Sequence, residues 1–104
     1  MTLSALESLL QGVCPETYRY GAPPSAARRL VWAEYGTNNL IGDDVAQLSI
    51  PLIQIDVYTQ SENDTLAADV ITALANNGQY CEVMGIEYDD ETMTLRTILQ
   101  MQLI

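Results

Sequence analysis

The chain has 104 residues, 48% of them hydrophobic, and its 14 acidic residues outweigh four arginines, with no lysine or histidine, to give a net charge of −10. This length fits one domain around a single core, and the acidic excess disfavours sequence-independent binding to nucleic acid or anionic membranes. Because histidine is absent, Ser-His-Asp and Cys-His catalytic arrangements are excluded, and the commonest zinc sites lose their nitrogen ligands.

The sequence has neither a basic segment at its start nor an apolar run near the ~20 residues of a membrane span, so we expect synthesis in the cytoplasm. Cys14 and Cys81 allow one disulfide at most. A reducing compartment favours free thiols at both positions.

The N-terminal segment is predicted to be a short amphipathic helix, because Leu3, Leu6, Leu10 and Val13 recur at three- and four-residue spacing. Residues 14–28 are predicted to form an irregular arm, since their prolines and glycine interrupt any long regular element.

Two strands follow, at about 29–35 and about 50–60. In the second, Ile53, Ile55 and Val57 alternate with polar residues, which is typical of a half-buried strand.

Residues 36–47 between these strands are predicted to form a long hairpin loop. Connections of this length are usually functional or disordered. Leu40, Ile41 and Val45 argue against plain disorder, since exposed tips rarely carry three aliphatic residues without a partner. The alternative is that these residues extend the strands or fold back onto the core.

A second helix is predicted after Ser61 and Asp64, whose spacing resembles a capping box, with Asn63 or Asp64 as the alternative cap. A stop is predicted at Asn77-Gly78. One face of this helix is apolar and is expected to pack on a sheet: Leu66, Val70 and Leu74.

Two last strands, at about 80–88 and 93–104, are predicted to form a hairpin with a turn at 89–92. The full order is helix, strand, strand, helix, strand, strand. It predicts a two-layer α+β domain with a mainly antiparallel four-stranded sheet and both helices on one face.

Catalytic signatures are lacking. The chain contains no glycine-rich phosphate motif, and its acidic turns lack the spaced ligands of a calcium loop. A glycosidase-type carboxylate pair, Glu34 with Asp56, is allowed by residue type alone. We therefore expect a protein that is not an enzyme and has no catalytic residues, cofactor or metal site.

The element order and two stretches, Trp32-Ala33-Glu34-Tyr35-Gly36 and Gln54-Ile55-Asp56-Val57-Tyr58, resemble the tail terminator or tail-completion proteins of long-tailed bacteriophages. The resemblance covers most of the chain, from the N-terminal helix to the C-terminal hairpin. It departs from the family at Ala26-Ala27-Arg28-Arg29, where members often place a proline and an aromatic residue before the first strand.

This resemblance implies a subunit of a ring, hexameric in the family, that caps the head-proximal end of the tail tube and joins it to the head. The implied partners are further copies of the chain, the tail tube protein and the head-tail connector protein, while DNA passes through without specific binding and no membrane is involved. The implied location is the host cytoplasm during assembly and then the virion tail. Two alternatives are a head-tail connector or neck protein, and a small ferredoxin-like ligand-binding or regulatory domain.

Three groups of residues are the interface candidates. Residues of the predicted loop are expected to contact a neighbour or the tube: Leu40, Ile41, Asp43 and Asp44. Around the first strand, Arg28 and Arg29 are expected to bind carboxylates of a neighbouring subunit beside Trp32, unless Trp32 is simply core.

The last strand supplies the third group: Arg96, Gln100 and Gln102. Its apolar alternation continues to the final residues, where a free end would ordinarily fray. A neighbouring subunit's sheet edge is expected to cover it. The alternative is a strand bent by a bulge near Thr97-Ile98 that wraps around its own core.

Overall fold

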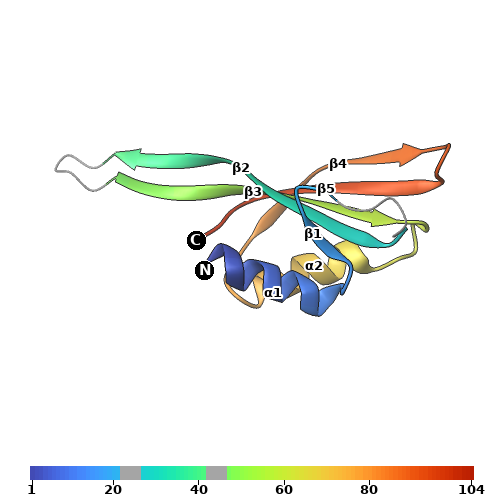
Figure 1. Cartoon of the computed structure of the whole chain (residues 1–104), viewed down its shortest axis with the longest axis horizontal. Helices are drawn as coiled ribbons and strands as arrows, with labels where there is room; N and C mark the ends of the chain where they lie inside the picture. Colours follow the sequence, from blue (N-terminus) through green and yellow to red (C-terminus); the bar gives the residue numbers. More distant parts are fainter. Residues whose placement is uncertain (22–26, 42–46) are drawn as a thin grey trace.

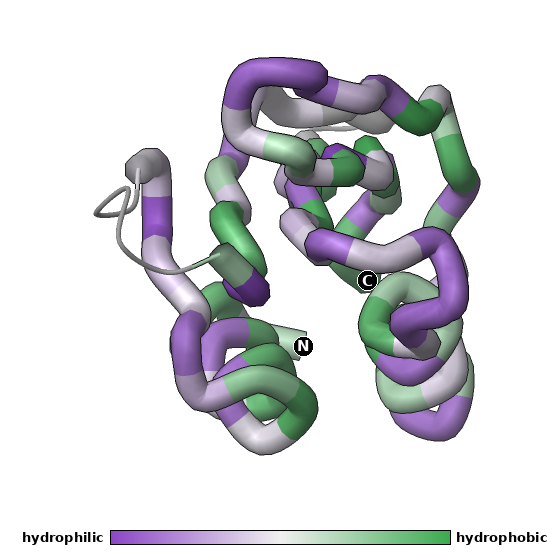
Figure 2. Tube along the Cα trace, turned by 90° about the vertical axis from the view of Figure 1, so that its right-hand side faces the viewer, coloured by the Kyte–Doolittle hydropathy of each residue, from purple (hydrophilic) through white to green (hydrophobic). Residues whose placement is uncertain are grey.

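The computed structural model of the chain describes residues 1–21, 27–41 and 47–104. Two helices, α1 (Leu3–Val13) and α2 (Leu66–Ala75), lie side by side on one face of a curved sheet (Figures 1 and 2). The sheet has the order β1-β2-β3-β5-β4, and its strands are β1 (Thr17–Arg19), β2 (Arg29–Ile41), β3 (Gln47–Thr59), β4 (Cys81–Asp89) and β5 (Thr94–Gln102). The predicted α+β class is confirmed.

The sheet is five-stranded and mixed, so the prediction of a four-stranded, mainly antiparallel sheet is wrong in strand number. The additional strand is β1, which lies inside the predicted irregular arm at 14–28 and pairs in parallel with β2, with Thr17 opposite Leu30. A strand of three residues is too short to show a period of two. Every other neighbouring pair is antiparallel.

The segment 36–47, predicted as a long hairpin loop, is strand through Ile41 and again from Gln47. The register runs from Gly36 opposite Leu52 to Ile41 opposite Gln47, after a bulge at Tyr35. Gly36, Asn38 and Asn39 have low strand propensity, which is why the sequence reads as a loop. Pairing with β3 supplies the strand, and the alternative of extended strands is the correct one.

Both helices are held by local caps and by buried apolar faces. In α1, the Thr2 hydroxyl accepts a hydrogen bond from the Ala5 amide at 3.0 Å, and Leu6 and Leu10 are fully buried. In α2, Thr65 is the N-cap without a side-chain capping bond, so the predicted capping box does not form. The alternative holds, because Asp64 Oδ1 accepts a hydrogen bond from the Leu66 amide at 3.0 Å.

The core lies between the helices and the middle of the sheet. The predicted apolar face of α2 is buried there, together with residues of the central strands: Leu66, Val70, Leu74, Leu30, Trp32, Ile53, Ile55, Val57, Leu99, Met101 and Leu103. Burial of each large side chain contributes roughly 1.5–3 kcal/mol, so these residues dominate the stability of the fold. After α2, Gly78 adopts φ 74°, the left-handed stop predicted there.

The molecule is elongated, with extents of 53 × 24 × 22 Å. The β2–β3 hairpin extends from one side of the helix-covered centre and the β4–β5 hairpin from the other (Figure 1). The helices cover the centre of the sheet, and both hairpins reach beyond them. None of the helices in the described part of the chain is long and apolar enough to cross a membrane.

Candidate interaction surface

The most unusual surface of the molecule is on β4. Four large apolar side chains are exposed there: Val83 (52%), Met84 (54%), Ile86 (67%) and Tyr88 (55%). We call these four residues the β4 surface. Contiguous exposed apolar residues on a soluble domain mark an interaction site.

The strand register explains why these side chains are exposed. Val83, Ile86 and Tyr88 lie opposite Leu99, Thr97 and Leu95 of β5, and so share the face of the sheet that carries the helices. The helices leave this part of that face uncovered. Met84 is the extra residue of a bulge between Val83 and Gly85.

The backbone of β4 is also open. It stands at the edge of the sheet with β5 as its neighbour, so within the described residues no strand pairs with its other side. Native edge strands are usually short or protected by lysine or proline, whereas β4 has nine residues and neither of these. This surface was not predicted from the sequence, although the loss of apolar-polar alternation over Val83-Met84-Gly85-Ile86 was a signal for it.

The opposite face of the sheet carries a network of polar side chains. Arg96 Nη2 lies 2.8 Å from Asp56 Oδ2, and Arg96 Nη1 lies 3.4 Å from Glu87 Oε2. Gln54 donates to Asp56 Oδ1 at 3.1 Å, and Gln100 donates to Gln54 at 3.4 Å. The network satisfies Asp56, which is 9% exposed, and connects β3, β5 and β4.

Two hollows border this network. The larger, of about 480 Å³, is lined by Arg29 and Arg96 but also by Glu87 and Asp89, so its charged groups balance. The smaller, of about 370 Å³, is lined by Gln100 and Gln102 together with further residues that include Tyr35, Tyr80 and Ile104. Neither hollow gathers an excess of positive charge that would select an anion.

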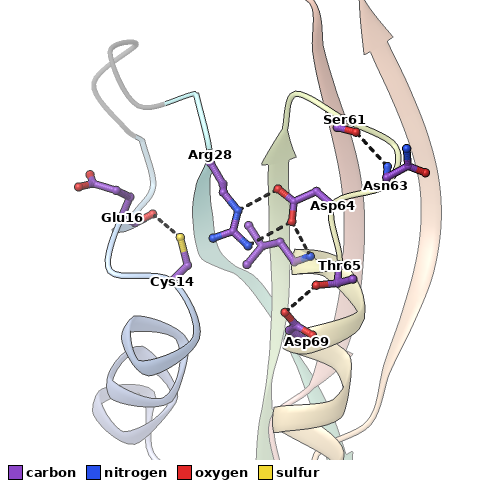
Figure 3. Close-up of polar contacts among 9 residues, drawn as sticks. Cys14, Glu16, Arg28, Ser61, Asn63, Asp64, Thr65 and Asp69 are labelled. Carbon is purple, nitrogen blue, oxygen red and sulfur yellow. Dashed lines mark hydrogen bonds and ion pairs between the residues drawn. The ribbon is translucent and has the colours of Figure 1, made fainter.

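Arg28 binds a carboxylate of its own chain. Its Nε and Nη2 donate to the two oxygens of Asp64 at 2.8 and 3.1 Å (Figure 3). This hydrogen-bonded pair lowers the pKa of Asp64 and raises that of Arg28. The pair joins the start of β2 to the start of α2. The predicted contact between Arg28 and a carboxylate is therefore present, but the carboxylate belongs to the same subunit and not to a neighbour.

The remaining candidates around the first strand are placed as follows. Trp32 is core, with 1% of its surface exposed, so its assignment to a subunit interface is wrong and the core alternative holds. The Arg29 guanidinium lies over the Tyr58 ring, 3.9 Å from its centroid. Leu40 and Ile41 belong to β2, while Asp43 and Asp44 lie outside the described residues.

The last strand is interior. β5 lies between β3 and β4, so both of its backbone edges are paired within the chain, and it cannot accept a neighbour's strand as we predicted. The irregularity expected near Thr97-Ile98 lies instead on β4, at Met84. A contact of Arg96, Gln100 and Gln102 with a partner through the polar face of the sheet stays a prediction.

The chain covers its own C-terminal end. Gln79, 4% exposed, donates to the Ile104 carbonyl at 2.7 Å and accepts from the Ile104 amide at 2.9 Å. The Met1 amino group donates to the same carbonyl at 2.7 Å, and Leu103 is buried. The continued apolar alternation that suggested a partner is explained by packing against the chain's own core.

The described residues hold no cluster of three or more side chains suited to a metal ion. The carboxylate pair Glu34 and Asp56 is not formed, because the register places Glu34 opposite Ile53 of the core and Asp56 on the other face. Cys14 and Cys81 are free thiols; Cys14 is buried, and burial raises the pKa of Cys81.

Among known proteins, the chain is similar in fold to a component of a solved virion structure. No protein-family model matches the chain, and no match was found among curated proteins. A chain in the solved structure described as the virion of a native gene transfer agent particle superposes with a TM-score of 0.59 at 13% identity. The match covers 96% of this chain and 87% of that one, so the two share a fold.

Proposed function

We propose that the protein is a structural component of a virion or virion-like particle, and specifically a tail terminator. The observation that carries the proposal is the fold shared over nearly the whole length with a chain of the gene transfer agent virion. The resemblance of 32–36 and 54–58 to tail terminator sequences points in the same direction.

The surface of the molecule supports an assembly role. A nine-residue edge strand with the exposed apolar β4 surface is costly to leave in water and is covered when subunits associate. A contact between unlike surfaces of identical subunits either closes into a ring or continues as a filament.

In the proposed mechanism, several copies form a ring, hexameric in the family, at the head-proximal end of the tail tube. One face of the ring is complementary to the last layer of tube subunits. The other face does not accept another tube subunit and instead joins the head. Termination is then a matter of surface recognition, without catalysis or a cofactor.

The test uses the purified protein and the tail tube protein of the same particle. Light scattering measures the mass in solution, and negative-stain microscopy measures the lengths of tubes assembled with and without the protein. We expect closed oligomers, at least on tube ends, and shorter tubes with one capped end. A strict monomer that does not associate with tubes would refute the assembly role, and binding to heads without binding to tube ends would favour a connector.

A further inference from the structure

Among the described residues, the sheet has two long edges that no strand pairs with, and they differ in character. One is β4, described above. The other is the outer edge of β2 beyond Trp32, because β1 pairs with Leu30 to Trp32 and, among the described residues, no strand continues that pairing to Ile41. Both open edges present backbone N–H and C=O groups that another strand can satisfy.

The two edges match in length. β4 has nine residues, from Cys81 to Asp89, and the open part of β2 runs from Ala33 to Ile41. Each contains one bulge, at Met84 and at Tyr35, followed by a regular stretch: Gly85–Asp89 on β4 and Gly36–Ile41 on β2. A pairing of these regular stretches requires no distortion at either bulge.

Charge selects which edges meet. β4 and the turn after it carry five acidic residues and no basic one: Glu82, Glu87, Asp89, Asp90 and Glu91. Two β4 edges placed together would therefore repel, since like charges on adjacent strands are destabilising. The stretch from Tyr35 to Ile41 has no charged residue, so β2 accepts β4 without this repulsion.

We infer that β4 of one copy of this chain pairs with the outer edge of β2 of the next copy, through Gly85–Asp89 and Gly36–Ile41. The contact continues the sheet from subunit to subunit and brings the β4 surface against the neighbour. Because the two edges are different, the contact is heterologous and can close a ring. The inference deepens the proposed function and rests on it only for ring closure.

Cross-linking tests the pairing directly. In a Cys81→Ser background, which leaves Cys14 buried, one sample carries Ile86→Cys and another Thr37→Cys; both original side chains are exposed. After mild oxidation we expect disulfide-linked dimers in the mixture and little in either sample alone. Dimers in the unmixed Ile86→Cys sample would show that β4 pairs with β4 and would overturn the inference. The absence of dimers from the mixture and from both unmixed samples would overturn it as well.

A charge variant provides an independent measurement. Ile86→Lys places an ammonium group on the edge, and we expect the apparent dissociation constant between copies to rise at least about tenfold, or 1.4 kcal/mol, in sedimentation experiments. Ala68→Lys, on the exposed side of α2, is the control with the same change in charge and is expected to leave association unchanged. Unfolding curves verify that both variants are folded.

The outcomes separate this inference from the proposed function. If Ile86→Lys remains fully oligomeric, the edge pairing is wrong, whether or not the protein still limits tube length. If the variant remains oligomeric but loses tube binding, the β4 surface binds the tube protein and the inference is again wrong. If oligomers dissociate and tubes are no longer capped, both proposals are supported.

Discussion

All four arginines of this acidic chain make contacts within it. Arg28 and Arg96 pair with carboxylates, Arg29 lies over Tyr58, and Arg19 lies 4.9 Å from the Trp32 ring centroid. The residue type was a good guide to the contact, because the arginine fork favours carboxylates and aromatic faces. It did not predict which carboxylate each arginine binds, since a carboxylate of the same chain is chemically identical to one across an interface.

Asp64→Asn tests the Arg28 pair. Asparagine keeps an oxygen for the Leu66 amide, so the variant removes mainly the charge, and we expect a loss below about 1 kcal/mol because the pair is partly exposed. The folded pKa of Asp64 is lowered, so its stabilisation is fully present above the ordinary value of about 3.9 and is lost as pH falls through the lowered value. The difference in urea midpoint between variant and parent should therefore be present at pH 7 and shrink below about pH 4. A difference that grows on acidification would contradict the pair.

Trp32→Ala distinguishes a core residue from an interface residue. The side chain is 1% exposed among core residues, and truncation of a buried tryptophan costs about 3–5 kcal/mol. This is a large share of the about 5–15 kcal/mol that stabilises a typical domain, so the urea midpoint should fall sharply or folding should be lost. A variant that keeps the parent's stability but no longer associates would return Trp32 to the interface.

At the scale of elements, the sequence predicts those parts whose pattern is local. The leucine spacing of 3–13 and the apolar face of Leu66, Val70 and Leu74 identify both helices, because a helix buries one stripe with a period of 3.6 residues. β1 and the outer half of the β2–β3 hairpin were not predicted, because their pairing partners, not their own residues, make them strands.

The order of the strands in the sheet could not be predicted from the sequence either. The position of the candidate interaction surface depends on that order, because the order decides which strand lies at the edge. Alternation in 93–104 identifies a strand but does not reveal that it lies between two others. The unpaired edge therefore lies on β4 and not, as predicted, on β5. The interface candidates on β5 were chosen because of that predicted edge, so this argument for them no longer holds.

Deletion of residues 100–104 follows from this topology. The deletion removes the buried Met101 and Leu103 and the backbone clamped by Gln79, so we expect unfolding at every concentration, seen as loss of the circular dichroism transition. Gln79→Ala should cost about 1–3 kcal/mol by leaving the Ile104 amide without its acceptor, while the Ile104 carbonyl keeps the Met1 amino group. Asn77→Ala, which loses one exposed hydrogen bond to Ala73, is the control and should change stability by less than about 0.5 kcal/mol. A folded deletion variant that merely associates less would restore the earlier interpretation.

At the scale of the whole molecule, charge and shape separate two functions of the surface. The apolar β4 surface and the uncharged stretch of β2 lie on opposite edges of one sheet, in an elongated body of 53 × 24 × 22 Å. The acidic excess extends onto β4 itself, through Glu82, Glu87 and Asp89. The proposed association between subunits therefore pairs an acidic edge with an uncharged one, which avoids the repulsion between two β4 edges.

This distribution predicts that the protein does not bind duplex DNA. With 14 acidic residues against four arginines, all of them engaged within the chain, no basic surface is available to displace the counterions of the phosphate backbone. An electrophoretic mobility assay with random duplex DNA should show no shift, even at about 20 mM salt, where electrostatic binding is strongest. Arg28→Ala, which frees Asp64, is the matched control and should behave in the same way. A shift that strengthens as the salt concentration falls would show that a cationic surface exists and would contradict this prediction.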